Sequence, residues 1–476
     1  MAASDQRNIV FAYQNAPQYM PAPQYSARQV VIGPNTADNW HPDGRVMMLN
    51  TPAGSYDLGE VLAKLPKDQQ PDLIIVKGDA SGINLPVGFD HLDIPKVLII
   101  GDTQHQQTPL RTMLRYANEN KFDLLISDHK RHHLHYFIEA GATNAHWMPG
   151  LLVRDWQIPL YDEKHFPVTF AGQAGSIHPV RTAAIEAVQR AGIEIITGIV
   201  PQERAADIYG RSIVTLNPSL NGDLNLRSFE IPLSGGCAIA DRLSPQSGQS
   251  MLFEEGKTIV TYNSVDELIE RIRHYLSNPE EAIRISQQAQ DLAKAKHSPA
   301  VKQQQFMELI DNHIVPDGYD GRLEKRSTAL ESDGFDDLLI RVEQYELFQE
   351  WHRTTPVLKA VATAEADPRL VCDLVDLHRL QIDWLGDAAP SLFTEAGVAD
   401  QVGQASPNSA NDADTLITGS KHINGEGLDG SLPKTVLLTD WKREGDQAAI
   451  GQAKAALVTQ GYRHDEASCP GLFVQG

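Results

Sequence analysis

The stretch SIVTLNPSLNGDLNLRSFEIPLSGGCAIAD, residues 212–241, contains in order a strand, a polar loop, a short helix, a glycine pair and a second strand. The apolar run from Ser212 to Leu216 ends at Asn217-Pro218-Ser219. Open α/β sheets place their ligands in loops at the carboxyl ends of parallel strands. We therefore predict that Asn217 and Ser219 either bond a ligand or cap their own loop.

Two charged residues lie at the start of the helix that follows this loop. Arg227 and Glu230 are three positions apart, so their side chains share one face of the helix. A guanidinium can clamp a diphosphate, and a carboxylate can accept two hydrogen bonds from a ribose diol. Phe229 lies between them and is included in the predicted site. Gly235 and Gly236 are expected to end the helix and to let backbone approach a ligand closely.

A glycine turn lies upstream, in VTFAGQAG at residues 168–175. Gly172 and Gly175 occur where a predicted strand meets its helix, and amides at such a turn can cradle a phosphate. A tight turn without a ligand is an alternative interpretation of the same pattern. Arg181, one turn into the helix, either reaches the phosphates or is solvated.

Together these segments resemble the CgeB-like group of glycosyltransferases, which have two facing Rossmann-like domains, the GT-B fold. The resemblance runs from about Pro167 to Ile310, through HPVRTAAIEAV, LRSFEIPLSGGCAIA and MLFEEGKTIVTY. It implies that Glu230 contacts the ribose of a nucleotide-sugar donor. It also implies a second glutamate eight residues earlier, where this chain has Gly222. Such enzymes are generally metal-independent, because helix dipoles and basic side chains act on the leaving diphosphate.

The first 150 residues contain several strand-sized apolar runs. NIVFAYQ, PDLIIVKGD, IPKVLIIGD and FDLLISDH fit a sheet that helices cover on both faces. We predict an α/β protein with a Rossmann-like acceptor domain over 1–150, a hinge over 151–166 and a donor domain over 167–314. The hinge contains Pro159 and breaks the periodicity.

The resemblance stops after His313. We expect a mostly helical extension over 315–400, a linker over 401–432 and a small β-α-β-like segment over 433–476. Residues 315–476 carry 14 Lys and Arg against 27 Asp and Glu. This acidic extension is a candidate surface for a protein partner.

Asp102 and His105 are the candidates for a catalytic base. Both follow the apolar run VLII in GDTQH, so they should lie at the carboxyl end of a strand, facing the cleft. Transfer with inversion needs a group that takes the proton of the acceptor hydroxyl. Transfer with retention needs no base in that role, and the sequence leaves both outcomes open.

A histidine cluster in SDHKRHHLHYF offers a zinc interpretation. Its members are His129, His132, His133 and His135. No cysteine is nearby, and no acidic third ligand follows in register. A polar helix near the cleft that touches the acceptor is the preferred interpretation, and we predict no metal.

Composition narrows the remaining possibilities. A chain of 476 residues is longer than one hydrophobic core usually supports, so two or three domains are expected. A net charge of -21 argues against nucleic acid or an anionic membrane as partner. No apolar run approaches the ~20 residues of a membrane span, and no secretory signal is evident. Three scattered cysteines indicate reduced thiols, and we expect a cytoplasmic protein.

The predicted function is transfer of a sugar from a nucleotide-diphosphate sugar to a glycan, protein or small-molecule acceptor. The chain shows no nucleophile elbow, phosphate-binding P-loop or Cys-x-x-Cys pair, so hydrolase, ATPase and redox functions lack support. A non-catalytic nucleotide-sugar-binding or scaffold protein is the main alternative, because Gly222 replaces a glutamate. A nucleotide-sugar 2-epimerase, acting on the donor alone, is a minor one.

Overall fold

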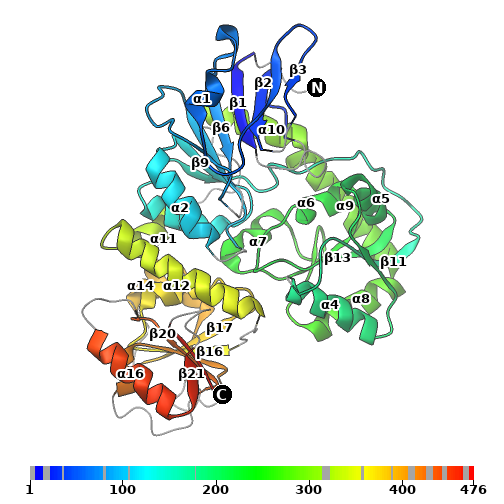
Figure 1. Ribbon diagram of the computed structural model, residues 1–476. Coiled ribbons are helices and arrows are strands. Elements are labelled where there is room, and N and C mark those ends of the chain that lie inside the picture. The colour runs from blue at the N-terminus through cyan, green and yellow to red at the C-terminus, as the bar shows by residue number, and fades with distance from the viewer. Residues whose placement is uncertain are drawn as a thin grey trace. The chain divides into compact units, whose positions relative to one another are not determined.

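The computed structural model describes most of the chain and divides it into two compact units (Figure 1). The N-terminal unit comprises residues 1–105, 112–134 and 142–319, and the C-terminal unit comprises 106–111, 135–141 and 320–476. None of the described helices is long and apolar enough to cross a membrane. The described residues are 6–13, 22–34, 37–78, 82–104, 108–176, 178–312, 322–354, 359–386, 390–405, 413–424, 433–441, 447–464 and 471–475.

The first sheet of the N-terminal unit has the strand order β10-β9-β8-β6-β1-β2-β4-β3. Neighbouring strands run parallel except β3, which pairs antiparallel with β4. After β1 the chain adds strands first on one side of it, beginning with β2, and later on the other side, beginning with β6, so the strand order reverses between β1 and β6. At this reversal Tyr13 pairs in register with Lys77. The strands are β1 (Asn8–Tyr13), β2 (Arg28–Gly33), β3 (Asn39–Trp40), β4 (Val46–Asn50), β6 (Leu73–Lys77), β8 (Lys96–Ile100), β9 (Leu124–Ser127) and β10 (Ala145–Trp147).

Helices from two distant parts of the chain cover the first sheet. Between the strands the chain forms α1 (Leu58–Leu62), α2 (Pro109–Asn120) and α3 (Leu134–Glu139), and α3 from its second residue on belongs to the C-terminal unit. The late helix α10 (Pro299–Asn312) packs against the sheet. Phe306 of α10 is fully buried in the same core as Phe11, with its ring centroid 4.6 Å from that of Tyr25. A small separate sheet pairs β5 (Tyr56–Asp57) with β7 (Pro86–Val87).

The second sheet has the order β12-β11-β13-β14-β15, and all its strands are parallel. Its order reverses between β11 and β13. In doubly wound sheets of this 2-1-3-4-5 order, ligands bind outside the carboxyl ends of the two strands at the reversal. The strands are β11 (Phe166–Ala171), β12 (Ile195–Gly198), β13 (Ser212–Asn217), β14 (Ala238–Asp241) and β15 (Val260–Tyr262).

Helices pack on both faces of the second sheet. The α4 and α8 helices share a core with Val168 and Phe170, whereas α5 and α6 pack around Ala171 and Ala238 on the other face. Ser264 caps α8 by accepting a hydrogen bond from the Glu267 amide at 3.1 Å. The helices are α4 (Pro179–Arg190), α5 (Gln202–Gly210), α6 (Arg227–Leu233), α7 (Gln249–Leu252), α8 (Val265–Ser277) and α9 (Pro279–Lys296).

The C-terminal unit contains a third sheet, so the prediction of a mostly helical extension is wrong. The expected linker, 401–432, itself contributes β18, β19 and α15. Sequence periodicity favoured the long helix α12, whereas the strands are runs of only three to five residues. The strands are β16 (Lys359–Thr363), β17 (Gln381–Leu385), β18 (Val402–Gln404), β19 (Thr415–Thr418), β20 (Thr435–Leu438), β21 (Tyr462–His464) and β22 (Leu472–Gln475).

The third sheet is also doubly wound, with the order β18-β17-β16-β19-β20-β22-β21 and an antiparallel β22. Its reversal lies between β16 and β19, where protein groups fill the space. Thr363 Oγ1 lies 2.7 Å from Thr418 Oγ1, and a side chain at Gly419 would overlap the Glu365 carbonyl oxygen. The surrounding helices are α11 (Arg322–Ala329), α12 (Phe335–Thr354), α13 (Pro368–Leu374), α14 (Ser391–Glu395), α15 (Ser420–Asn424) and α16 (Gln447–Thr459).

Candidate functional site

Two arginines converge at the reversal between β11 and β13. Arg227, the first residue of α6, donates from Nη1 to the Ala171 carbonyl and from Nη2 to the Pro218 carbonyl, each at 3.4 Å. Its guanidinium also lies 4.8 Å from the centre of the Phe170 ring. Arg181 of α4 donates from Nε to the same Pro218 carbonyl at 3.2 Å. The two predicted cations therefore meet at one loop, at the carboxyl ends of the strands. Doubly wound sheets bind their ligands at this position.

The buried arginine of this pair remains a cation at neutral pH. Burial, followed by the charge of Arg227, lowers the pKa of Arg181 to about 10. Asp223, Asp241 and Asp102 act in the opposite direction. Such a guanidinium pair matches the charge of a diphosphate.

Glu230, one turn into α6, titrates close to neutral pH. Its side chain is partly buried, and this burial raises its pKa to about 7, against the opposing charges of Arg227 and Arg154. Arg154 comes from the predicted hinge, and sequence spacing gave no signal for it. A carboxylate of this kind accepts hydrogen bonds in its ionised form, so its affinity for a diol should rise with pH.

The glycine turn after β11 has a different role from the predicted phosphate cradle. The Gly172 amide already donates to the Gly198 carbonyl at 2.9 Å, and the Gly175 amide donates to Thr182 Oγ1 at 2.8 Å. Gly172 has a φ of +154°, and a β-carbon there would lie 2.5 Å from Arg227 Nη1. We conclude that Gly172 leaves room for the guanidinium, and that neither amide is available to a phosphate.

Three other predicted donor residues are structural. Phe229 is fully buried, with its ring centroid 5.7 Å from that of Phe253, so it belongs to the core. Gly235 and Gly236 precede β14, at the edge of the sheet opposite the arginines. A β-carbon at Gly236 would lie 3.0 Å from the Tyr209 carbonyl oxygen, so the close approach is to protein backbone. Sequence alone could not separate these packing contacts from ligand contacts.

The loop residues after β13 divide between the two predicted roles. Ser219 donates from its amide and its hydroxyl to the carboxylate of Asp241, at 2.7 and 2.6 Å. Its hydroxyl also accepts from the Gly222 amide at 3.2 Å and so caps its own loop. Asn217 donates to Ser228 Oγ at 3.1 Å. Its Oδ1 atom is buried and has no hydrogen-bond partner among the described residues. Asn217 therefore remains a candidate for ligand binding.

A row of charged side chains lies at the carboxyl edge of the first sheet. Asp102, just after β8, has Oδ1 3.4 Å from Nε2 of His129, and the other ring nitrogen lies 2.6 Å from Asp128 Oδ1. Lys77, at the end of β6, lies 3.4 Å from Asp128 Oδ2. Sequence analysis predicted Asp102 but not Asp128 or Lys77, although both also stand at strand ends.

The charges in this row fix the protonation of its histidine. Burial opposes the charge of His129, but Asp128 and Asp102 raise its pKa to about 9. Burial also opposes ionisation of Asp128, yet His129 and Lys77 lower its pKa to about 2. His129 is therefore an imidazolium at neutral pH and cannot serve as a base there. His105 lies outside the described residues, which leaves Asp102 as the candidate base within them.

Within the N-terminal unit, hydrogen bonds join the two carboxyl edges. Gln104 donates to Asp223 Oδ2 at 3.2 Å, and Lys130 donates to the Asn221 carbonyl at 2.5 Å. Gly222, where the resemblance implies a glutamate, has a φ of +72°, and Asp223 follows it. The Asp102 charge also acts on Arg181. The predicted base and the predicted diphosphate clamp thus belong to one region.

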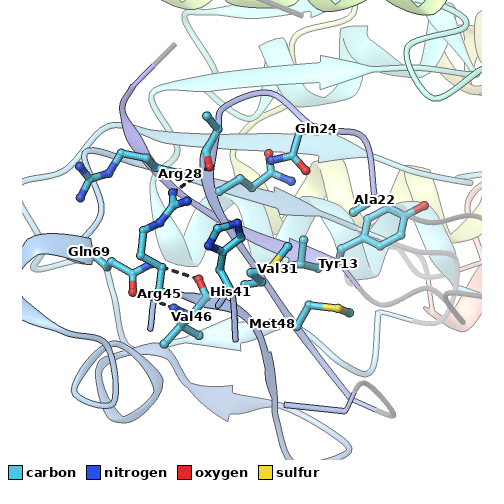
Figure 2. Close-up of a pocket in the computed structure, with 13 residues that line it drawn as sticks. Tyr13, Ala22, Gln24, Arg28, Val31, His41, Arg45, Val46, Met48 and Gln69 are labelled. Carbon is cyan, nitrogen blue, oxygen red and sulfur yellow. Dashed lines mark hydrogen bonds between the residues drawn. The ribbon is translucent and has the colours of Figure 1, made fainter. Parts of the chain in front are cut away.

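Neither of two cavities in the N-terminal unit is lined by the predicted donor residues. One, of about 260 Å³, lies against β2 and β4 (Figure 2). Its polar side chains already have protein partners: Arg45 Nε donates to Asp43 at 2.8 Å, and Arg28 Nε donates to Asn8 at 2.7 Å. The other, of about 350 Å³, has different chemistry and is treated below.

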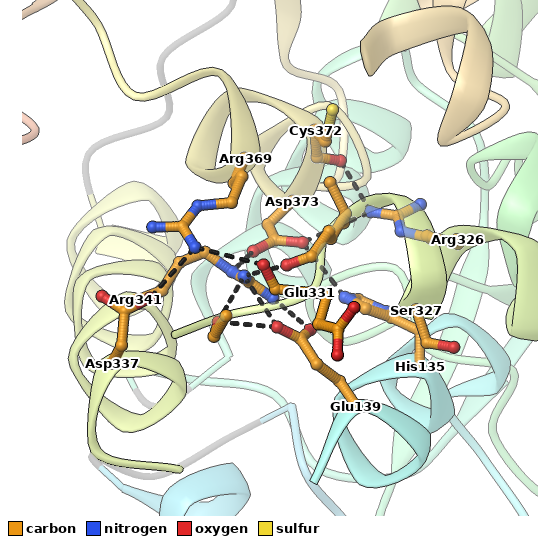
Figure 3. Close-up of polar contacts among 12 residues, drawn as sticks. His135, Glu139, Arg326, Ser327, Glu331, Asp337, Arg341, Arg369, Cys372 and Asp373 are labelled. Carbon is orange, nitrogen blue, oxygen red and sulfur yellow. Dashed lines mark hydrogen bonds and ion pairs between the residues drawn. The ribbon is translucent and has the colours of Figure 1, made fainter. Parts of the chain in front are cut away.

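The last histidine of the cluster belongs to a buried ionic network in the C-terminal unit (Figure 3). His135 Nε2 lies 3.1 Å from Asp373 Oδ1, and Arg341 pairs with both Asp373 and Glu139, at 2.9 and 2.5 Å. Arg326 pairs with Asp376 at 2.6 Å. These side chains are at most 2% exposed. His129 and His135 thus belong to different units, and no group of three or more metal-ligating side chains occurs among the described residues.

Comparison with known proteins finds a family match for the middle of the chain. Residues 159–308 match the family described as "Glycosyl transferase-like". They therefore form a glycosyl transferase-like domain, which extends from the hinge through the second sheet to α10. No curated protein matches the chain.

Several solved structures are similar to the chain at low identity. Sucrose-phosphate synthase from Thermosynechococcus elongatus has 13% identity and a TM-score of 0.46, over 64% of this chain and 98% of that one. HepE from Anabaena, in complex with UDP-glucose, has 15% identity and a TM-score of 0.44, over 64% and 99%. UDP-forming α,α-trehalose-phosphate synthase from Burkholderia xenovorans has 13% identity and a TM-score of 0.44, over 65% and 99%.

Proposed function

We propose that the chain is a glycosyltransferase that binds a nucleotide-diphosphate sugar at the reversal between β11 and β13. The observation that carries the proposal is the convergence of Arg181 and Arg227 on the Pro218 carbonyl, with Glu230 one turn further along α6. The glycosyl transferase-like domain over 159–308 contains all of these residues. Within this class, the motif order favours the CgeB-like group.

In the proposed reaction, the bond between the anomeric carbon and the diphosphate breaks as a bond to the acceptor oxygen forms. Arg181 and Arg227 would hold the diphosphate and stabilise the negative charge that develops on it, a role that a divalent ion performs in other enzymes. Glu230 would accept the ribose hydroxyls. If configuration inverts, Asp102 would take the proton of the acceptor hydroxyl. We propose that no metal is required, and that the protein acts in the cytoplasm.

The non-catalytic alternative rests on the left-handed Gly222 in place of a glutamate and on the acidic residues 315–476. It predicts nucleotide binding without turnover, or no nucleotide binding. Asp223 beside it offers a carboxylate, but both of its oxygens already accept hydrogen bonds from Leu220 and Gln104. Binding of a protein partner by the acidic residues 315–476 remains a prediction.

A thermal-shift panel tests the donor site directly. The wild type, Glu230→Ala and the exposed control Glu194→Ala would be titrated with UDP, GDP, CMP, dTDP and ADP sugars. We expect one base to stabilise the wild type and the control but not Glu230→Ala. Incubating that donor alone tests for an epimerase, and adding acceptors tests for transfer. If no donor stabilises any of the three proteins, the donor site is wrong.

A further inference from the structure

The cavity of about 350 Å³ lies at the reversal of the first sheet, in the N-terminal unit. Tyr13, the last residue of β1, lines it and pairs in register with Lys77 of β6. Ligand sites in doubly wound sheets form outside the carboxyl ends of the two strands at the reversal. The cavity thus reaches the carboxyl end of β1, one of the two strands at the reversal of the first sheet.

Segments of the first domain, of the predicted hinge and of α10 together line the cavity. Arg154, which lines it, acts on the charge of Glu230 on the donor side. Tyr25, which lines it from the first domain, responds to the charge of Asp128. Asp128 in turn holds His129 beside Asp102. The residues that line the cavity therefore interact electrostatically with groups on both the donor side and the side of the candidate base.

The wall chemistry combines aromatic faces with neutral polar groups. Tyr13 and Trp156 supply rings. Gln24 and Gln303 supply amides, whose nitrogens already donate to the backbone carbonyls of Ser26 and Gln24. Tyr25 is 2% exposed, and its hydroxyl has no hydrogen-bond partner among the residues that the structure describes. Burial raises the pKa of Tyr25, so this hydroxyl stays neutral and can donate. A buried hydroxyl without a partner costs free energy that a polar ligand would recover.

We propose that this cavity binds a saccharide, as the acceptor subsite of the transferase; the acceptor role rests on the proposed function. The C–H faces of a pyranose pack on aromatic rings, because the faces of those rings carry partial negative charge. The hydroxyls of a pyranose both donate and accept hydrogen bonds. Pockets of roughly 300–1,000 Å³ with a few placed polar groups are typical small-molecule sites.

Charged ligands fit the cavity less well than neutral ones. Arg154 is a single cation, burial lowers its pKa, and Asp155 lines the same cavity. A phosphate would find two cations at Arg181 and Arg227 instead.

Saturation-transfer NMR on the full chain tests the proposal. The probes are glucose, N-acetylglucosamine, maltose and cellobiose, and each is measured in the presence and in the absence of each nucleoside diphosphate. The variants are Trp156→Ala, Tyr25→Phe and the control Trp40→Ala, which removes an exposed ring outside both cavities. We expect one probe to bind, with affinity at least tenfold weaker in Trp156→Ala and severalfold weaker in Tyr25→Phe. Trp40→Ala should match the wild type, and Glu230→Ala should still bind the probe.

Each other outcome has a definite meaning. Saccharide binding that is insensitive to both Trp156→Ala and Tyr25→Phe would overturn the cavity as its site. Nucleotide binding without any saccharide binding would overturn this inference and leave the proposed function standing. Saccharide binding that depends on Trp156 in a protein that binds no nucleotide would keep the sugar site and overturn its acceptor role. Binding of neither class would overturn both.

Discussion

A β-carbon placed on Gly172 would lie 2.5 Å from Nη1 of Arg227. Gly175 provides a matched control, because it also has positive φ but has no atom within 4 Å of an added β-carbon. We expect Gly172→Ala and Gly175→Ala each to lose roughly 1 kcal/mol of stability through backbone strain. Only Gly172→Ala should weaken nucleoside diphosphate binding, by about tenfold or more. Calorimetric titration of both variants checks this, and equal losses of affinity would contradict the assignment of Gly172.

Nucleotide affinity should rise between pH 6 and 8, because Glu230, with a pKa of about 7, becomes ionised and accepts hydrogen bonds. Glu230→Gln should remove this pH dependence and reduce affinity at pH 8 by roughly 10- to 100-fold. A carboxyl with a raised pKa stabilises the fold below its unfolded pKa and loses that contribution as pH rises through the folded value. The variant should therefore melt higher than the wild type at pH 8, and a lower melting temperature would contradict the shift.

The arginine pair should discriminate ligands by their phosphates. Arg181→Met and Arg227→Met are each expected to reduce the affinity for a nucleoside diphosphate at least tenfold. The affinity for the corresponding nucleoside should be nearly unchanged, because the ribose contact belongs to Glu230. Arg190→Met, which removes an exposed arginine paired with the exposed Glu186, is the control. Equal losses for nucleoside and diphosphate would indicate misfolding of the loop rather than a lost clamp.

The imidazolium of His129 depends on Asp128, 2.6 Å away. Asp128→Asn should lower the pKa of His129 from about 9 toward 6.5, as measured by NMR titration of ring protons assigned with His129→Gln. The wild type should also lose stability relative to His129→Gln, on the order of 3 kcal/mol, as pH rises from 6.5 through 9. An unchanged titration in Asp128→Asn would show that the carboxylate does not hold the proton.

Removing one partner of the buried network should destabilise the C-terminal unit strongly. Arg341→Met leaves Glu139 without its buried cation and leaves Asp373 with Arg326, 3.6 Å away, and removal of one partner of a buried pair costs about 3–5 kcal/mol. The solvent-exposed pair Arg204 and Asp207 provides the comparison, where Arg204→Met should cost less than about 1 kcal/mol. Chemical denaturation of both variants measures the difference, and similar costs would show that the network adds little.

Local sequence signals located the two sheets of the N-terminal unit and the arginine pair. Buried parallel strands are short apolar runs bounded by turn residues, and residues three apart on a helix share a face, so Arg227 and Glu230 could be paired from spacing alone. Asp102 followed from its position after a strand. These predictions needed no knowledge of packing between distant segments.

The remaining site features depend on long-range packing. Phe229 and Gly236 looked like ligand contacts because they flank charged residues, yet their neighbours are Phe253 and the Tyr209 backbone. Arg154 lies in a hinge without periodicity, so nothing in its surroundings marks it. The third sheet was missed because its strands have three to five residues, too few for the alternation that identifies a half-buried strand.

The pairing of α3 with α12 also sets an order of events during synthesis. Glu139 precedes its partner Arg341 by 202 residues. At about 5–20 residues per second, the ribosome needs roughly 10–40 s to supply that arginine. During this interval the Glu139 carboxylate must stay hydrated, and the second half of α3 has no buried partner to dock against. Glu139 and the second half of α3 therefore reach their final buried contacts only after the C-terminal unit has been translated.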